Sequence, residues 1–380
     1  MPTLSSWVYQ YETPEAQPGF DDSSWTAASK TSSNSSTPIP PGQPDLFADD
    51  YGFHHGDVWY RGTYSGASAA TSVNISYRAG GVGMIEAWLD GTFLGSNRLP
   101  TPGIYSTSPA ESATATFTFS AALQTDGTHE LSVVVRMMGH SEDGNSNNAN
   151  KAARGLTAVT LTGAPSAPIS WKIQGNEGGE NITDTVRGPM NNGGLYGERA
   201  GWYLPGYPDG NWAPVTLPYS DTQPGVAWYR TTFTLNEPAG ADASLGLTIN
   251  DVATKAYRAT IFLNGWNMGQ YINNVGPQHT FVLPNGILHT GIGPPAFKGF
   301  AASPSVPACG TNWVTRVGGS SSPPAGPLPD YLGVIVSSSV SQTGAAVSGD
   351  TTGIVVVKTD PGYGPLPTEH GTGTVVATAR

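Results

Sequence analysis

The sequence predicts an all-β protein made of tandem antiparallel β-sandwiches and a low-complexity tail. Three observations support this fold class. The 380 residues include 49 Gly and 32 Pro, which disfavours long helices over most of the chain. Apolar residues alternate with polar ones in short runs, and a set of aromatic motifs occurs twice in the same order. With 10% aromatic residues, the chain also has the apolar bulk that a core requires.

Runs with a period of two predict the individual strands, because successive side chains on a strand point to opposite faces. Turn residues separate the runs at spacings typical of antiparallel sheets. In the first half the runs cover 69–77, 84–89, 113–120, 129–137 and 156–161, and in the second half 227–235, 243–250, 257–264 and 279–283.

Asn-Gly and Asp-Gly pairs predict tight hairpin turns between some of these strands. Two-residue hairpin turns require positive φ angles, which Asn, Asp and Gly tolerate best. Such pairs occur at Asp90-Gly91, Asn264-Gly265 and Asn285-Gly286.

The two halves align through their aromatic residues. The matching segments are 19–25 (GFDDSSW) with 206–212 (GYPDGNW), 58–61 (VWYR) with 227–230 (AWYR), and 87–91 (AWLDG) with 261–265 (IFLNG). This order predicts two homologous sandwiches, in residues 1–165 and 166–295, joined at the stretch 164–168.

The second copy is predicted to be incomplete. The alternating strand at 129–137 should have a partner soon after residue 288, but 289–295 leads instead into Ser, Pro and Gly-rich sequence through Pro329. We therefore expect a strand to be missing and residues 296–380 to form a Gly/Pro/Ser-rich, disordered tail. Two isolated β-like runs lie within it, at 332–340 and 353–357.

Charge and cysteine content exclude several functions. There are 17 Lys and Arg against 28 Asp and Glu, giving a formal charge of −11, and no basic stripe that would suit a nucleic acid. Cys309 is the only cysteine, so a disulfide framework or a Cys-based zinc site is not possible. We expect no cofactor. No apolar run is long enough to span a membrane.

Acidic composition and a surface of Ser, Thr, Asn and Gly favour an extracellular protein. Three Asn-x-Ser/Thr sequons are candidate N-glycosylation sites, at Asn34, Asn74 and Asn181. No signal peptide follows Met1, which suggests a fragment or a start codon assigned inside a larger gene.

Possible metal and catalytic residues have simpler explanations. His54, His55 and Asp57 cannot all face one ion from a single extended segment, because side chains alternate. The loop 143–147 lacks the Gly at the sixth position and the Glu at the twelfth position of a calcium loop. The segment 139–143 lacks the strand-to-helix turn that a serine nucleophile needs. Solvated loops explain Glu177, Glu180 and Glu198 better than acid/base catalysis does. We therefore assign no metal ligand and no catalytic residue.

Aromatic and amide residues of the second copy are candidates for carbohydrate contact or domain docking. The apolar face of a sugar packs on an aromatic ring while amides bind its hydroxyls. Packing within the core or between domains is the alternative for the rings. The candidates are Trp202, Tyr203, Asn264, Trp266, Asn267, Gln270 and Tyr271.

These motifs resemble a known family. The segments 4–8 (LSSWV), 19–25, 48–54 (ADDYGFH) and 59–62 (WYRG) are similar to the C-terminal jelly-roll domains of fungal glycoside hydrolase family 35 β-galactosidases. So are 138–140 with 151–155, and, in the second copy, 201–206 (GWYLPG), 225–233 (GVAWYRTTF) and 262–277. The resemblance covers about 1–290 and ends near Leu288, where the family continues with a turn and a closing strand.

The resemblance implies two tandem jelly-roll (galactose-binding-like) sandwiches from a secreted enzyme that hydrolyses terminal β-galactosides. The family places its pair of catalytic carboxylates on a separate TIM barrel, and no Glu here matches that pair. The chain would then be an accessory, non-catalytic part that braces the barrel and shapes substrate access, inactive alone. Its implied partner is that barrel and possibly a β-galactoside, with no nucleic acid or membrane. A free-standing carbohydrate-binding module and a truncated gene product without independent function are the alternatives.

Overall fold

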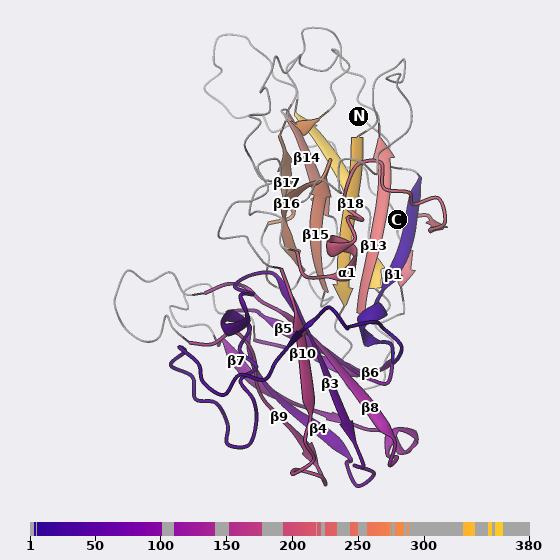
Figure 1. Cartoon of the computed structure of the whole chain (residues 1–380). Helices are drawn as coiled ribbons and strands as arrows, with labels where there is room; N and C mark the ends of the chain where they lie inside the picture. The colour runs from indigo at the N-terminus through magenta and orange to yellow at the C-terminus, as the bar shows by residue number, and fades with distance from the viewer. Residues whose placement is uncertain are drawn as a thin grey trace, which may run out of the picture.

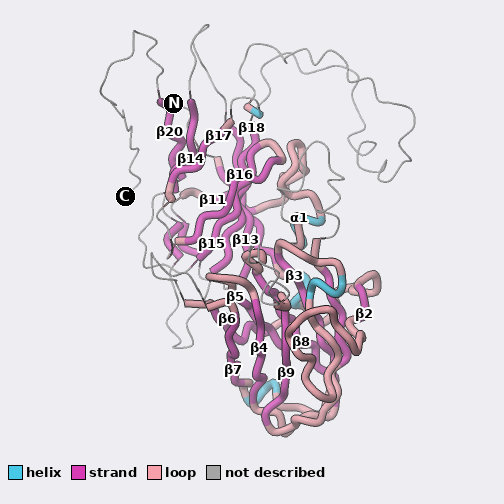
Figure 2. Tube along the Cα trace, turned by 90° about the vertical axis from the view of Figure 1, so that its left-hand side faces the viewer, coloured by secondary structure: helices cyan, strands magenta, loops and turns pink. Residues whose placement is uncertain are grey.

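A computed structural model describes the chain over residues 4, 6–100, 110–140, 152–176, 193–217, 219–221, 225–233, 244–249, 257–273, 275, 278–284, 287–288, 330–338, 349–351 and 354–359. The described residues form two β-sandwiches that lie end to end (Figures 1 and 2). Helices are limited to single turns, at η1 (Pro14–Ala16), η2 (Ala48–Tyr51), η3 (Ala121–Leu123) and α1 (Tyr196–Arg199). The predicted all-β class is confirmed.

The first sandwich packs a six-stranded sheet against a three-stranded one, and neighbouring strands in both sheets are antiparallel. The larger sheet has the order β2 (Thr26–Ala27), β10 (Ser170–Gln174), β3 (Asp57–Ser65), β8 (Thr128–Arg136), β5 (Met84–Leu89) and β6 (Thr92–Arg98). The smaller sheet has the order β7 (Ser112–Thr118), β4 (Ser72–Arg78) and β9 (Gly155–Thr162).

The second sandwich repeats this arrangement. Its larger sheet has the order β11 (Ala213–Val215), β1 (Trp7–Glu12), β13 (Gly225–Phe233), β18 (Asp330–Ser338), β15 (Tyr257–Leu263) and β16 (Trp266–Ile272). Its smaller sheet has the order β17 (Thr280–Leu283), β14 (Ser244–Ile249) and β20 (Ile354–Thr359). A separate pair joins β12 (Tyr219–Asp221) to β19 (Gly349–Thr351).

The strands predicted from alternation are all present within a few residues of their predicted bounds. The strands that were not predicted are β1, β2, β3, β6, β10, β11, β12, β16 and β19. β3 reads as a nearly continuous apolar run with an internal Arg, and its first six residues are buried. Alternation is weak there because both faces of β3 are covered over much of its length.

The sheets do not follow the predicted boundary between residues 165 and 166. β1 comes from the N-terminus but lies in the second sandwich, where it pairs with β13 along its whole length. β10 follows the predicted joint but lies in the first sandwich, where it pairs with β3. Each sandwich therefore takes one strand from beyond the predicted boundary, and the two are tied together by the chain itself.

The expectation of a missing strand is wrong for the second sandwich. β18 lies between β13 and β15, at the position that β8 occupies in the first sandwich. β20 pairs with β14, as β9 pairs with β4. Strands drawn from the predicted tail thus complete the repeat; the other residues of 296–380 lie outside the described residues.

Equivalent hairpins show the repeat at residue level. Asp90 and Asn264 have φ angles of 51° and 50°, and a glycine with positive φ follows each of them, so the turns at Asp90-Gly91 and Asn264-Gly265 are confirmed. The register shifts at corresponding places, between Ala87 and Trp88 and between Ile261 and Phe262. The pair Asn285-Gly286 lies outside the described residues.

Three clusters of buried side chains hold the molecule together. One fills the first sandwich and one fills the second. The third lies between the two larger sheets, and six of its buried residues are tryptophans. Because of this third cluster, β5 and β15 are buried at every position, one face in each sandwich's own core and the other between the sandwiches.

Candidate functional site

The layer between the sandwiches is built from tryptophans at equivalent positions of the two copies. Trp59 and Trp88 of the first sandwich lie 5.4 Å apart, measured between ring centroids. Trp228 of the second stacks on Phe262 at 5.8 Å and 17°, and Trp202 packs against Trp228 at 5.8 Å. Both sets of rings belong to one closely packed cluster, and such packing opposes movement of one sandwich against the other.

Buried carboxylic acids lie within the same layer. Trp228 Nε1 donates a hydrogen bond to Glu12 Oε2, and Arg199 forms an ion pair of 2.6 Å with Glu15. Burial raises the pKa of Glu12 to about 8, with a further increase from the neighbouring Glu15. Burial also raises the pKa of Glu15, although Arg199 opposes it.

A second group of charges joins β3, β5, β8 and β15. Arg136 donates to both oxygens of Asp57, at 2.9 and 3.1 Å. Burial raises the pKa of Glu86 to about 8, although the nearby Arg136 opposes this. Arg258 crosses from the second sandwich and donates to Met138 Sδ at 3.2 Å, and burial with the adjacent Arg136 lowers its pKa to about 9.

These acids have raised pKa values but cannot meet a substrate. A glycosidase needs one protonated and one ionised carboxyl group facing a shared substrate space. Glu12, Glu15 and Glu86 are fully buried and Glu198 is 8% exposed. Burial also raises the pKa of Glu198 well above its ordinary value. The positions of these four acids indicate a structural role in joining the sandwiches.

An open polar pocket lies beside this layer, on the same face of the larger sheet of the first sandwich. On β3, Trp59 faces the layer, and Arg61 and Thr63 follow it on the same side of the strand. The pocket has a volume of about 350 Å³. It is lined by Pro18, Phe20, Asp22, Arg61, Thr63, Asp90, Thr128, His129, Glu130 and Lys172.

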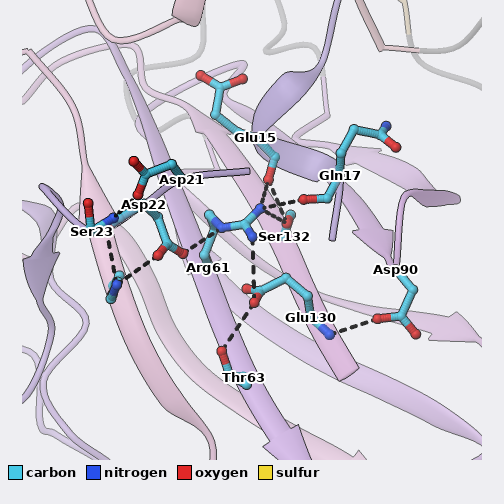
Figure 3. A network of polar contacts seen from close by, with 11 residues as sticks. Glu15, Gln17, Asp21, Asp22, Ser23, Arg61, Thr63, Asp90, Glu130 and Ser132 are labelled. Carbon is cyan, nitrogen blue, oxygen red and sulfur yellow. Dashed lines mark hydrogen bonds and ion pairs between the residues drawn. The ribbon is translucent and has the colours of Figure 1, made fainter. Parts of the chain in front are cut away.

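Arg61 organises the floor of this pocket (Figure 3). Its Nε donates to Asp22 Oδ2 at 2.7 Å, and its Nη2 lies 3.6 Å from Glu130 Oε2. Its Nη1 donates to the backbone carbonyls of Glu15 and Gln17, which holds the segment after η1 against the sheet. Only 3% of the Arg61 side chain is exposed, so its charge is directed into these contacts.

The walls carry further paired charges. Lys172 Nζ lies 2.7 Å from Asp22 Oδ1, and Thr63 donates to Glu130 Oε2 at 3.1 Å. Burial opposes ionisation of Asp22, but its bonds to Lys172 and Arg61 lower its pKa overall. For Glu130, burial outweighs the attraction of Arg61, and its pKa is raised.

His129 and Asp90 close one end of the pocket. His129 Nδ1 lies 2.7 Å from Asp90 Oδ2, and the other Asp90 oxygen accepts from the backbone N–H of Glu130. Burial would lower the pKa of His129, but its bonds to Asp90 and to the Thr125 carbonyl raise it overall.

The candidate residues of the second copy occupy separate surroundings. Trp202 is buried in the layer between the sandwiches, and Tyr203 stacks on Phe262 at 4.9 Å. Tyr271 is 1% exposed in the core of the second sandwich, packed near Tyr257. The rings of Trp202 and Tyr271 are therefore not accessible to a sugar in this structure.

The remaining candidates lie at the β15–β16 hairpin. Asn264 Nδ2 donates to the Ile287 carbonyl at 2.6 Å, and Asn267 Oδ1 accepts from the Gly269 N–H at 2.8 Å. Trp266 and Gln270 are partly exposed on β16, an edge strand. The two amides thus stabilise local backbone. All four of these hairpin residues are partly exposed, as is Tyr203.

The sequons differ in their surroundings. Asn34 is exposed in a loop. Asn74 is on β4, where its Nδ2 donates to Thr162 and its Oδ1 accepts from Thr116. Asn181 lies outside the described residues.

His54, His55 and Asp57 each contact a different partner. His54 Nδ1 contacts Asp49, His55 Nε2 contacts Asn176, and Asp57 pairs with Arg136. Within the described part of the chain, no three potential ligand residues cluster around one point.

The pocket around Arg61 was not predicted from the sequence. Its signal was present in the repeat, because Arg61 in the apolar motif VWYR and Asp22 in GFDDSSW both have counterparts, Arg230 and Asp209. Arg230 Nε donates to Asp209 at 2.8 Å, so the same clasp exists in both copies. An Arg that recurs within a buried strand must have a buried partner, which could have been sought among the recurring Asp residues.

Comparisons with known proteins agree with the repeat. The family described as "Beta-galactosidase second all-beta domain" matches residues 20–141 and again 196–292. "Probable beta-galactosidase C" of Penicillium rubens is 39% identical over 292 residues, and "Beta-galactosidase A" of Aspergillus niger is 36% identical over 293 residues. Each alignment covers 76% of this chain but 28% of the relative, so the chain spans little more than a quarter of their length.

A solved structure of a glycosyl hydrolase family 2 member from Bacteroides cellulosilyticus aligns with 74% of this chain and 30% of its own chain. The two chains are 10% identical, and the TM-score is 0.24. No helix among the described residues has the length and apolar character needed to cross a membrane.

Proposed function

Because this chain belongs to the family of beta-galactosidase second all-beta domains, we propose that it serves an enzyme that hydrolyses terminal β-galactosides. Its part in that enzyme is accessory and non-catalytic. It braces the catalytic domain and shapes the route by which substrate enters. The partner in this proposal is a catalytic barrel of the glycoside hydrolase family 35 type, and the two sandwiches are its jelly-roll domains.

The rigid connection between the two sandwiches is the observation that carries this proposal. Tryptophans from both copies belong to one buried cluster, with the Asp57–Arg136 pair beside them. β1 and β10 also cross between the two halves of the chain. A unit fixed in this way can hold a neighbouring domain in one orientation, whereas two loosely linked sandwiches could not.

We also propose that the parent enzyme is secreted and glycosylated. The acidic composition, with a formal charge of −11, and the exposed sequon at Asn34 support this proposal. Asn74 is a weaker acceptor, because both ends of its amide already form hydrogen bonds on β4.

Turnover of a chromogenic β-galactoside by the purified chain tests the accessory role. The expected result is no hydrolysis above the buffer background, because the raised-pKa carboxyl groups in the layer between the sandwiches are buried. Hydrolysis that disappears when one carboxylate of this chain is replaced, for example in Glu130→Gln, would overthrow the proposal. Residual hydrolysis that the variant retains would be assigned to a contaminating enzyme and would leave the proposal standing.

A further inference from the structure

The two copies share the arginine clasp but differ in what surrounds it. Arg61 and Arg230 each bind an aspartate through Nε and a backbone carbonyl through Nη1, of Glu15 and of Trp202 respectively. Both copies therefore use this arginine–aspartate pair to hold the segment that precedes Trp25 in the first copy and Trp212 in the second.

The second copy lacks the other charges of the pocket, those of Lys172, Glu130 and Asp90. In the first copy, Arg61 pairs in register with Lys172, and Thr63 pairs with Glu130. The corresponding partners in the second copy are Val8, opposite Arg230, and Tyr331, opposite Thr232. Asp90 of the turn corresponds to Asn264. The second sandwich forms without these charges, so the fold alone does not explain Lys172, Glu130 and Asp90.

The chemistry of the pocket suits a neutral ligand with many hydroxyl groups. Three carboxylates, of Asp22, Asp90 and Glu130, would repel an anion. Arg61 and Lys172 lie 2.7 Å from the two oxygens of Asp22 and would repel a metal cation. A sugar hydroxyl can donate to a carboxylate and also accept from an ammonium group, so it can satisfy both kinds of lining residue.

Glu130 and Phe20 give this pocket its two recognition elements. Glu130 Oε1 has no hydrogen-bond partner among the described residues, whereas Oε2 is bound by Thr63 and Arg61. Because Oε1 is buried, a ligand hydroxyl reaches it only when the carboxylate turns toward the pocket and exchanges its Oε2 contacts for the ligand. Phe20 and Pro18 form the apolar side, on which the C–H face of a sugar ring can pack.

We propose that this pocket, formed by Phe20, Asp22, Thr63, Asp90, Glu130 and Lys172 around Arg61, is a binding subsite for a neutral saccharide. Its volume of about 350 Å³ lies near the lower end of the range for small-molecule pockets and suits one or two sugar units. It binds them without chemical change. The site gives the accessory sandwiches a direct contact with carbohydrate that does not involve the catalytic domain's own residues.

Isothermal titration calorimetry on the full chain tests this proposal. The probes are methyl β-galactoside, methyl β-glucoside and a soluble β-galactan, at concentrations up to tens of millimolar. We expect saturable heat with at least one of them, and at least a tenfold loss of affinity in Glu130→Gln and in Lys172→Met. Comparing the monosaccharides with the polymer shows whether the pocket takes a terminal sugar or one within a chain.

Glu111→Gln is the matched control. Glu111 is a partly exposed carboxylate of the same sandwich that pairs with Arg78 and Arg154 outside the pocket, and its replacement should leave sugar affinity unchanged. Equal thermal unfolding of the variants establishes that each is folded. No saturable heat with any probe, or equal losses in Glu111→Gln and Glu130→Gln, would overturn the saccharide site. Either result would leave the accessory role intact, because that role is tested separately, by the absence of hydrolysis in the purified chain and by support of a catalytic domain.

Discussion

At the scale of single residues, Glu86 is the most unusual group in the molecule. It is fully buried on β5, and neither of its carboxylate oxygens has a hydrogen-bond partner among the described residues. Burial keeps this carboxyl group protonated up to a pH of about 8, compared with 4.5 for an ordinary Glu. The folded chain therefore binds a proton that the unfolded chain releases between these two pH values.

This difference predicts a pH-dependent stability. As pH rises from about 4.5 to 8, the unfolded Glu86 ionises first, so the free energy of unfolding falls over that window. In Glu86→Gln the fall should be less steep by about 1 kcal/mol per pH unit, because one titrating group is gone. Denaturant unfolding followed by tryptophan fluorescence between pH 4 and about 9 measures the slope.

Val134→Ala serves as the control for this prediction. Val134 lies opposite Glu86 in the β5–β8 register and belongs to the same buried layer, but it does not titrate. Its truncation should lower stability by a similar amount at every pH. If Glu86→Gln kept the wild-type slope, the assignment of a protonated Glu86 would be incorrect.

Residue patterns in the sequence could identify part of this layer but not its acids. The motifs VWYR and AWYR identify Trp59 and Trp228 as equivalent positions of the repeat, and the structure places both in the layer. Nothing in the run MIEAWL distinguishes Glu86 from a solvated carboxylate on an alternating strand. Its burial depends on the other sandwich, which covers the outer face of β5.

At the scale of elements, β18 shows why the end of the second sandwich could not be predicted. Its alternation was visible in the sequence, but strand pairing depends on partners more than 60 residues away, in β13 and β15. A long Gly and Pro-rich segment precedes it, and distance along the chain favoured a separate tail. The predicted boundary also placed β1 and β10 in the wrong sandwiches, because the repeat identifies matching motifs but does not show which sheet each strand joins.

The position of β18 leads to a prediction about its backbone. Val336 lies opposite Ala227 of β13 and Ala259 of β15, in the middle of the sheet. Proline removes a ladder hydrogen bond and is not tolerated in a central strand, so Val336→Pro should destabilise the second sandwich by about 3 kcal/mol or more. Limited proteolysis with mass spectrometry should show faster cleavage within 225–272, while the first sandwich stays protected.

Val336→Ile keeps the N–H group and the β-branched shape and is the control for this variant. It should digest at the wild-type rate. Equal protection of β13 and β15 in Val336→Pro and in the wild-type chain would mean that β18 does not lie between them.

At the scale of the whole molecule, the two sandwiches act as one body. The clustered tryptophans, the buried acids and the exchange of β1 and β10 all oppose independent movement of the halves. The family matches two segments, 20–141 and 196–292, one in each copy of the repeat, which agrees with two homologous sandwiches. The resemblance recognised from motifs gave the family correctly, because those motifs include the glycines, aromatics and arginines that the fold itself requires.

We propose that this body supports a catalytic domain that lies outside it. A direct test replaces the aligned 293-residue segment of Aspergillus niger "Beta-galactosidase A" with this whole chain, so that β18 and β20 are included. A second version of that enzyme lacks the segment, and kcat/KM for a chromogenic β-galactoside is measured for both. We predict that the replacement restores hydrolysis lost on deletion. A folded, soluble replacement enzyme that is as inactive as the deletion would contradict the account.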